Sequence, residues 1–414
     1  MRMLAPDDLL QEVNHFDLRV FAASDATCNG PTVALQGNAS PVATQAGITN
    51  QSATINVPSG PRVFAVDGFA DQAGSARIAQ GCTAATLEPS VPAMVTIKLV
   101  RVGGPPPRVV YASNVNGFGM TALFIDDTMG GAPRQVTMTP VYASGSDYDF
   151  AGGSVVFSGV SSNVSLYTAS VDGAGGDTQL PFAGGADTGP VYSPDGLKIA
   201  FVSTRTGSRQ VFVIDLSAMG ETQISPGPGD AVAPGWSSDS QQLAWVALAP
   251  AAKVMVGKPN AMGGKALSTP APAQFAQPVW TTDGKILVAV ASAGKDDLVE
   301  WDPASDLRVT TLASLGNVRH PSLAPDGSVL LFVADGAMGD GDVYKFDFKA
   351  NGTKLSPLFS TSADEDWPAW APAQNEIAFT VNSKVEVAAP DGTGAKRLTT
   401  STATEVHPLF APVK

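Results

Sequence analysis

The segment Pro190-Val191-Tyr192-Ser193-Pro194-Asp195-Gly196 recurs along most of this 414-residue chain. Close copies begin at Pro234, Pro278, Pro321 and Pro368, and weaker copies begin at Pro140 and Pro408. Successive prolines of the series are 50, 44, 44, 43, 47 and 40 residues apart. A repeat of about 40–50 residues that contains several short strands is typical of the blades of a β-propeller.

Each repeat contains the residues that a four-stranded blade needs. The large side chain two positions after the proline, as at Trp236 and Trp280, is expected to pack between neighbouring blades. The Asp-Gly pair then favours a tight turn, because glycine adopts a positive φ at little cost. An apolar second strand follows, as in Ile199-Ala200-Phe201-Val202, and a third strand and a polar outer strand complete the unit.

The two ends of the repeat region predict how the ring closes. The last copy, from His407 onward, holds only a first strand, whereas Arg108-Val109-Val110-Tyr111-Ala112-Ser113 begins at a second strand. Pairing these segments would complete one blade and leave no open sheet edge. The count is then seven blades closed by the C-terminal strand, and six is the alternative if 144–159 is an insertion.

The first part of the chain predicts a separate domain, so that the whole protein is expected to be all-β. Period-two alternation in Phe16-Asp17-Leu18-Arg19-Val20-Phe21 and Arg62-Val63-Phe64-Ala65-Val66-Asp67 is typical of half-buried strands. A further strand is expected at 53–57. We therefore expect a small immunoglobulin-like β-sandwich over 1–103. A Gly/Pro linker at 104–107 precedes the propeller at 108–414.

Two cysteines bear on the compartment. Cys28 and Cys82 are the only cysteines, and both lie in the predicted sandwich, which favours one disulfide; two buried free thiols are the alternative. Because disulfides persist in oxidising compartments, we expect an extracytoplasmic protein, in the periplasm or at the cell surface. The N-terminal residues lack the apolar segment of a signal peptide, so the alternatives are a cytosolic protein or an exported one whose signal is absent from this chain, and the cysteines favour the second. No run of about 18 apolar residues predicts a transmembrane helix.

Composition excludes several classes of partner. Asp and Glu total 38 against 25 Lys and Arg, a net charge of −13. Such a surface repels nucleic-acid backbones and anionic lipid. With only three His and two Cys, the chain has no His-rich multi-metal site.

The aromatic-Ser-Pro-Asp-Gly repeat, followed by an apolar strand that ends in Phe, resembles the WD40-like repeats of TolB-type β-propellers. The chain departs from this pattern at Ala373-Gln374-Asn375, where the Asp-Gly turn is missing, and in the degenerate repeat near residue 140. The resemblance implies an exported bacterial protein that binds other proteins. Related propellers also occur as accessory domains of serine peptidases and in some polysaccharide lyases.

Residues just before each repeated proline are expected to ring the mouth of the central channel, because the first strand of a blade lines it. The candidate binding residues there are Asp187, Asp230, Arg319, His320, Asp366, Trp367, Glu405 and His407. Carboxylates beside Arg, Trp and His suit a divalent cation or a basic and aromatic peptide. The alternative is that the acids cap exposed loops and that the histidines are structural.

The chain has no Gly-x-Ser-x-Gly elbow and no α/β domain to carry one. The predicted function is therefore non-enzymatic: a monomeric cell-envelope protein, without a cofactor, whose propeller is a platform for a protein or peptide partner. The rival is a carbohydrate-active lyase or hydrolase that uses the channel carboxylates with His320 and His407. A divalent metal would assist that reaction.

Overall fold

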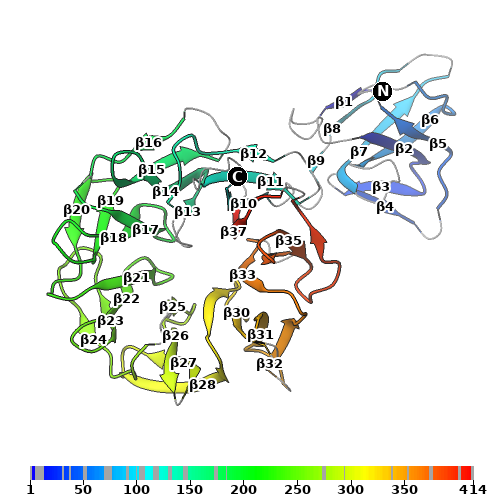
Figure 1. Ribbon diagram of the computed structural model, residues 1–414. Helices are drawn as coiled ribbons and strands as arrows, with labels where there is room; N and C mark the ends of the chain where they lie inside the picture. Colours follow the sequence, from blue (N-terminus) through cyan, green and yellow to red (C-terminus); the bar gives the residue numbers. More distant parts are fainter. Residues whose placement is uncertain are drawn as a thin grey trace. The chain divides into compact units, whose positions relative to one another are not determined.

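A computed structural model gives the fold of the chain. It describes residues 2–4, 14–29, 32–36, 39–49, 54–69, 77–89, 93–98, 100–101, 108–114, 121–128, 133–142, 148–171, 176–182, 184–272, 277–292, 294–336, 339–351, 354–372, 376–399 and 402–411. The chain divides into two compact units, Met1–Pro106 and Pro107–Lys414 (Figure 1). The predicted linker at 104–107 and the departure from the repeat at 373–375 lie outside the described residues.

The described residues of the first unit form one five-stranded antiparallel sheet and two short strand pairs. The sheet order is β5 (Ala43–Ile48), β2 (His15–Ala22), β6 (Gly60–Phe69), β7 (Arg77–Leu87) and β9 (Val100–Arg101). The short pairs are β3 (Ala26–Asn29) with β4 (Thr32–Leu35), and β1 (Arg2–Leu4) with β8 (Thr96–Lys98). Because the described strands form one large sheet, an immunoglobulin-like sandwich of two sheets stays a prediction.

Each face of the five-stranded sheet contributes side chains to a hydrophobic core. Leu18 and Phe64 belong to the core on one face, and Phe21 and Val63 belong to the core on the other. The predicted disulfide is confirmed, and Cys28–Cys82 joins β3 to β7. The strand expected at 53–57 is wrong: its described residues join no sheet, and Ile55 and Val57 only pack against the first core.

The second unit contains seven four-stranded antiparallel sheets among its described residues. In strand order from the inside outward, the first three sheets are β37 (Glu405–Ala411), β10 (Arg108–Ser113), β11 (Ala122–Asp127) and β12 (Arg134–Gln135); β13 (Tyr148–Ala151), β14 (Ser154–Val160), β15 (Val164–Ser170) and β16 (Thr178–Gln179); and β17 (Asp187–Tyr192), β18 (Lys198–Ser203), β19 (Gln210–Asp215) and β20 (Gly220–Gln223).

The next two sheets are β21 (Ala231–Trp236), β22 (Leu243–Ala247), β23 (Lys253–Gly257) and β24 (Lys265–Ala266); and β25 (Val279–Trp280), β26 (Ile286–Ser292), β27 (Lys295–Asp302) and β28 (Leu307–Leu315). The last two are β29 (Arg319–Leu323), β30 (Val329–Asp335), β31 (Gly341–Asp347) and β32 (Leu355–Phe359); and β33 (Glu365–Trp370), β34 (Ile377–Val381), β35 (Val385–Ala388) and β36 (Lys396–Arg397). No helix among the described residues is long and apolar enough to cross a membrane.

The C-terminal strand closes the ring. β37 pairs antiparallel with β10, in a register that runs from Arg108 opposite Ala411 to Ser113 opposite Glu405. Figure 1 shows β37 beside β10, next to the label of the C-terminus. The predicted closure is therefore confirmed, and it satisfies the backbone groups at what would otherwise be two open sheet edges.

The weak copy at Pro140 does not begin a blade, which corrects its place in the repeat. Val141 forms only isolated bridges, to Thr121 and to Gly159. The first strand of this sheet is β13, and Phe150 opposite Val155 takes the place that the repeat aromatic has in other blades. The described part of 144–159, which the six-blade alternative treated as an insertion, supplies β13 and most of β14.

Side-chain hydrogen bonds explain why Ser and Asp recur in the repeat. The Ser193 hydroxyl donates to Asp195 Oδ1 (2.5 Å) and accepts from the Lys198 N–H (2.9 Å). Gly196 completes the turn with a φ of 71°. The same bonds form at Ser237 with Asp239 and at Thr281 with Asp283.

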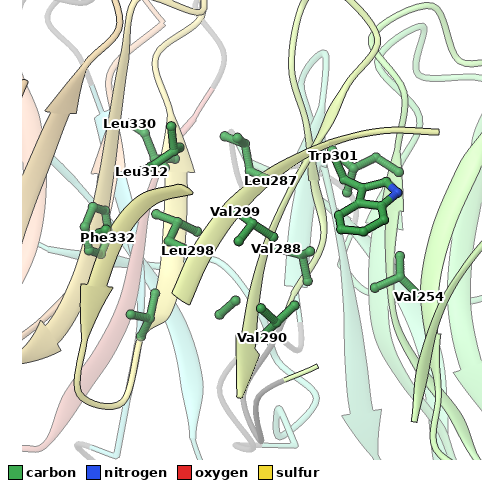
Figure 2. Close-up of a cluster of buried hydrophobic side chains, with 14 of the residues drawn as sticks. Val254, Leu287, Val288, Val290, Leu298, Val299, Trp301, Leu312, Leu330 and Phe332 are labelled. Atoms are coloured by element: carbon green, nitrogen blue, oxygen red, sulfur yellow. The ribbon is translucent and has the colours of Figure 1, made fainter. Parts of the chain in front are cut away.

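The repeat tryptophans connect neighbouring sheets, as predicted. The indole Nε1 of Trp236 donates to the Val191 carbonyl (3.1 Å), and that of Trp280 donates to the Gly235 carbonyl (3.1 Å). Apolar side chains fill the space between the sheets. Figure 2 shows Val288 and Val299 between Val254 on one side and Phe332 on the other.

Candidate functional site

The first strands of five of the seven described sheets, β37, β17, β21, β29 and β33, share a β-bulge at the residue before the repeated proline. The register shifts between Arg319 and Ser322 in β29, and between Asp366 and Ala369 in β33. A bulge re-aims the side chain that it carries. The residues before the prolines that have a left-handed φ are Gly189 (59°), Ala233 (55°), His320 (48°), Trp367 (53°) and His407 (53°).

Side-chain size at this bulge differs around the ring. A left-handed φ costs a residue other than glycine roughly 1–2 kcal/mol, so Gly189 alone among these five avoids the cost, and Ala233 meets it with the smallest side chain. Three consecutive sheets instead carry His320, Trp367 and His407. Large rings held in a strained backbone are a feature that folding alone does not require, and such strain concentrates at functional sites.

The three rings and Tyr148 form one continuous surface, which we call the aromatic wall. The rings of Trp367 and His320 are stacked, with centroids 3.4 Å apart and planes at 17°. His407 is tilted between Trp367 (4.7 Å between centroids) and Tyr148 (4.9 Å). The Tyr148 hydroxyl donates to the His407 carbonyl oxygen and so connects β13 to β37.

Asp366 fixes the orientation of His320. Its Oδ1 lies 2.5 Å from His320 Nδ1 and accepts the Trp367 N–H (2.8 Å). The guanidinium of Arg319 lies 3.6 Å from Asp366 Oδ2. Burial raises the pKa of Asp366, but the hydrogen bond and charge of His320, with the charge of Arg319, outweigh it and lower that pKa overall. Asp366 is therefore an ionised acceptor that holds the imidazole in place.

His407 is a neutral member of the wall. Burial, together with the charge of His320, lowers the pKa of His407 to about 3, although the charge of Asp366 raises it. Its Nδ1 is buried and has no hydrogen-bond partner among the described residues. The ring therefore presents an uncharged face and one unsatisfied nitrogen.

The aromatic wall borders a pocket of about 190 Å³. The other sides of this pocket include Asp149, Val191, Gln277, Ser322 and Leu409. These residues come from the inner ends of several sheets, so the pocket lies where the first strands converge. A small space lined by both polar and apolar groups is suited to one side chain or chain end of a ligand.

Three of the predicted site residues do not line this pocket and instead have structural partners within a blade or between blades. Asp187 is buried and pairs with Arg205 (3.0 Å). Asp230 pairs with Arg209 (2.8 Å) near the surface. Glu405 accepts the Thr399 hydroxyl and the Val385 N–H (3.2 Å). For these carboxylates the structural alternative is the better description, whereas Arg319, His320, Asp366, Trp367 and His407 come together.

No group of three or more His, Cys, Asp or Glu side chains in the described part of the chain is arranged to hold a metal ion. The divalent cation considered from the sequence thus has no ligand set there and stays a prediction.

Tyr148 and Asp149 were not predicted from the sequence. They follow from β13, which the weak copy at Pro140 concealed. One sequence signal could have found them: Phe150 is followed by Gly152-Gly153 and an apolar run, in the order aromatic, turn, strand that the other repeats show.

Known structures share this arrangement of strands. TolB from Acinetobacter baumannii superposes with a TM-score of 0.51 at 16% identity, over 86% of this chain and 81% of that one. The chain has a TolB-like β-propeller fold. Puromycin hydrolase also matches, with a TM-score of 0.56 at 16% identity, over 72% of this chain and 55% of the hydrolase. At such identities the likeness shows the fold alone.

Sequence comparison matches a smaller part of the chain than structure comparison does. No family model matches the chain. The uncharacterized protein Atu1656 of Agrobacterium fabrum is 36% identical over 110 residues, which are 26% of this chain and 36% of that protein. The match therefore spans little more than a third of that relative.

Proposed function

We propose that the TolB-like propeller binds a peptide segment of a partner protein at its channel mouth and catalyses no reaction. The supporting observation is the aromatic wall. Three consecutive sheets keep His320, Trp367 and His407 at left-handed positions and stack them along one side of a pocket. Aromatic rings supply a large contact area at a low entropic cost, which makes them effective anchors for a protein ligand.

The compartment that we propose follows from the first unit. The disulfide between Cys28 and Cys82 is of the kind that persists outside the cytoplasm. We therefore propose a monomeric, exported protein of the cell envelope, in the periplasm or at the cell surface. The partner is then another protein of that compartment.

The test is a selection of peptides on the full chain, followed by affinity measurements with the selected peptide. The variant Trp367→Ala removes the central ring of the wall and is expected to weaken binding by about tenfold or more. Ala233→Gly is the matched control, because it alters the equivalent bulge in another sheet without touching the wall. Equal affinity of the wild type and Trp367→Ala would refute the proposed site.

A second candidate rests on the His320–Asp366 pair. An imidazole held by a carboxylate beside a pocket is an arrangement that general base catalysis also uses. The candidate is a carbohydrate-active lyase or hydrolase assisted by a divalent metal. A large thermal stabilisation by Ca²⁺ or Mn²⁺ would favour it over peptide binding.

A further inference from the structure

Asp149 is a pocket carboxylate without a cationic partner. It is half-buried on β13, lines the pocket beside the aromatic wall, and accepts the Tyr192 N–H at Oδ2 (2.7 Å). No Lys, Arg or His among the described residues forms an ion pair with it. By contrast, Asp187 and Asp366 each lie beside an arginine.

The missing partner has an electrostatic consequence. Burial raises the pKa of Asp149 to about 6, although the backbone N–H groups of Phe150 and Tyr192 lower it. A carboxylate that is partly withdrawn from water is stabilised by a nearby cation, because backbone N–H groups compensate its desolvation only in part. An ammonium or guanidinium group of a ligand would supply this compensation, whereas a neutral group would not.

The aromatic side chains that line the same pocket are suited to contact a cation. His407 is held neutral by burial, and its unpartnered Nδ1 can accept a hydrogen bond. Trp367 and Tyr148 add aromatic faces, which attract cations through the negative potential above the ring. The guanidinium of Arg319 lies near Asp335, Asp364 and Asp366, so its charge is already compensated.

We propose that the segment bound at the channel mouth places a cationic group, a Lys or Arg side chain or a free N-terminal ammonium, between Asp149 and the aromatic wall. This inference rests on the proposed function and adds the chemistry of the ligand to it. The net charge of −13 favours the approach of such a ligand.

The experiment uses the full chain and three small probes. N-acetyl-lysine amide presents only a side-chain ammonium, and glycylglycine amide presents only a terminal ammonium. N-acetyl-norleucine amide is the neutral counterpart of the lysine probe. Binding to the wild type, to Asp149→Asn and to Trp367→Ala is measured by saturation-transfer NMR and calorimetry.

The wild type is expected to bind at least one cationic probe about tenfold more tightly than the neutral probe. Asp149→Asn keeps an acceptor for the Tyr192 N–H but loses the charge, so it is expected to fold and to lose this preference. The probe that shows the preference identifies the source of the cation. A preference that survives in Asp149→Asn, or no preference in the wild type, would overturn the cation site.

The two proposals fail in different ways. If all probes bind the wild type equally well and Trp367→Ala weakens the binding of each probe, the aromatic wall binds ligands and only the cation site is wrong. If the selected peptide binds equally well to Trp367→Ala, the proposed function is wrong irrespective of the charge of the probe.

A pH series adds an independent readout. Between pH 7.5 and 5 the wild type is expected to lose its preference for the cationic probe as Asp149 takes up a proton. The relative affinities of Asp149→Asn for the two probes are expected not to change over this range. Five other titratable groups lie in this region: Tyr148 on β13, Tyr192 on β17, His320 on β29, Asp366 on β33 and His407 on β37. Both proteins contain them, so any pH dependence that they cause survives in the variant. If the preference of the wild type for the cationic probe did not change with pH, the role of Asp149 would be contradicted.

Discussion

The indole of Trp367 stacks on the imidazole of His320 with ring centroids 3.4 Å apart, although the two residues belong to different sheets. Each residue directly precedes a repeated proline and has a left-handed φ. The stack therefore exists because two bulges turn both rings toward the channel. The same repeated bulge thus sets the path of each first strand and the orientation of the ring that it carries.

Replacing Trp367 by glycine and by alanine separates the strain of the bulge from the contacts of the ring. Both variants lose the stacking, but glycine adopts a φ of 53° without the penalty that alanine meets. We expect Trp367→Gly to be about 1 kcal/mol more stable than Trp367→Ala in denaturant unfolding. Equal stabilities would mean that the bulge is not strained.

The Asp366 carboxylate makes a pH-dependent contribution to stability. Because its pKa in the folded protein lies below the usual value, its contribution is present above about pH 4 and is lost as the pH falls through the folded pKa. Asp366→Asn is expected to lower the free energy of unfolding at pH 7 by roughly 2 kcal/mol. Unfolding curves at pH 7 and pH 3 should show this difference shrinking in acid, and a constant difference would argue against an ionised Asp366.

Two tryptophans of the repeat give a matched test of the bonds between blades. Trp280 Nε1 donates to the Gly235 carbonyl, whereas the buried Nε1 of Trp370 has no partner among the described residues. Trp280→Phe and Trp370→Phe remove the same atoms, so the difference between them isolates the hydrogen bond. Trp280→Phe is expected to cost about 1 kcal/mol more in the free energy of unfolding, and an equal loss would count against that bond.

Reduction of the disulfide should affect one unit only. Cys28 and Cys82 are 54 residues apart, and on the chain-entropy model their bond stabilises the first unit by about 4 kcal/mol. Calorimetry with and without reductant is expected to show one transition that moves to lower temperature and one that does not. The variant Cys28→Ser with Cys82→Ser should match the reduced protein, and a shift of both transitions would show that the units unfold together.

The repeat was predictable because its chemistry is local. The turn at Ser193 and Asp195 is formed by residues close in sequence, and Trp280 contacts the strand one repeat earlier. The roles of the carboxylates were not predictable, since their partners follow other strands. Arg205 lies 18 residues after Asp187, and no spacing in the sequence indicates that pair.

The pocket was only half predicted, for a related reason. His320, Trp367 and His407 precede prolines that the repeat identifies, so their convergence followed from the fold. Asp149 lies in a blade without the proline or the Asp-Gly turn, and only the pairing of β13 with β14 reveals its register.

The proposal that the channel mouth receives a protein partner is tested most directly by site-specific photo-crosslinking in a cell-envelope extract. A benzoylphenylalanine at Gln277 places the crosslinker in the pocket, and one at Leu307 places it on the outer strand β28, where the side chain is 64% exposed. We predict a discrete polypeptide adduct from position 277 that disappears when Trp367→Ala is added, and no such adduct from position 307. An adduct from position 307 alone, or one from position 277 that Trp367→Ala leaves unchanged, would contradict binding at the channel mouth.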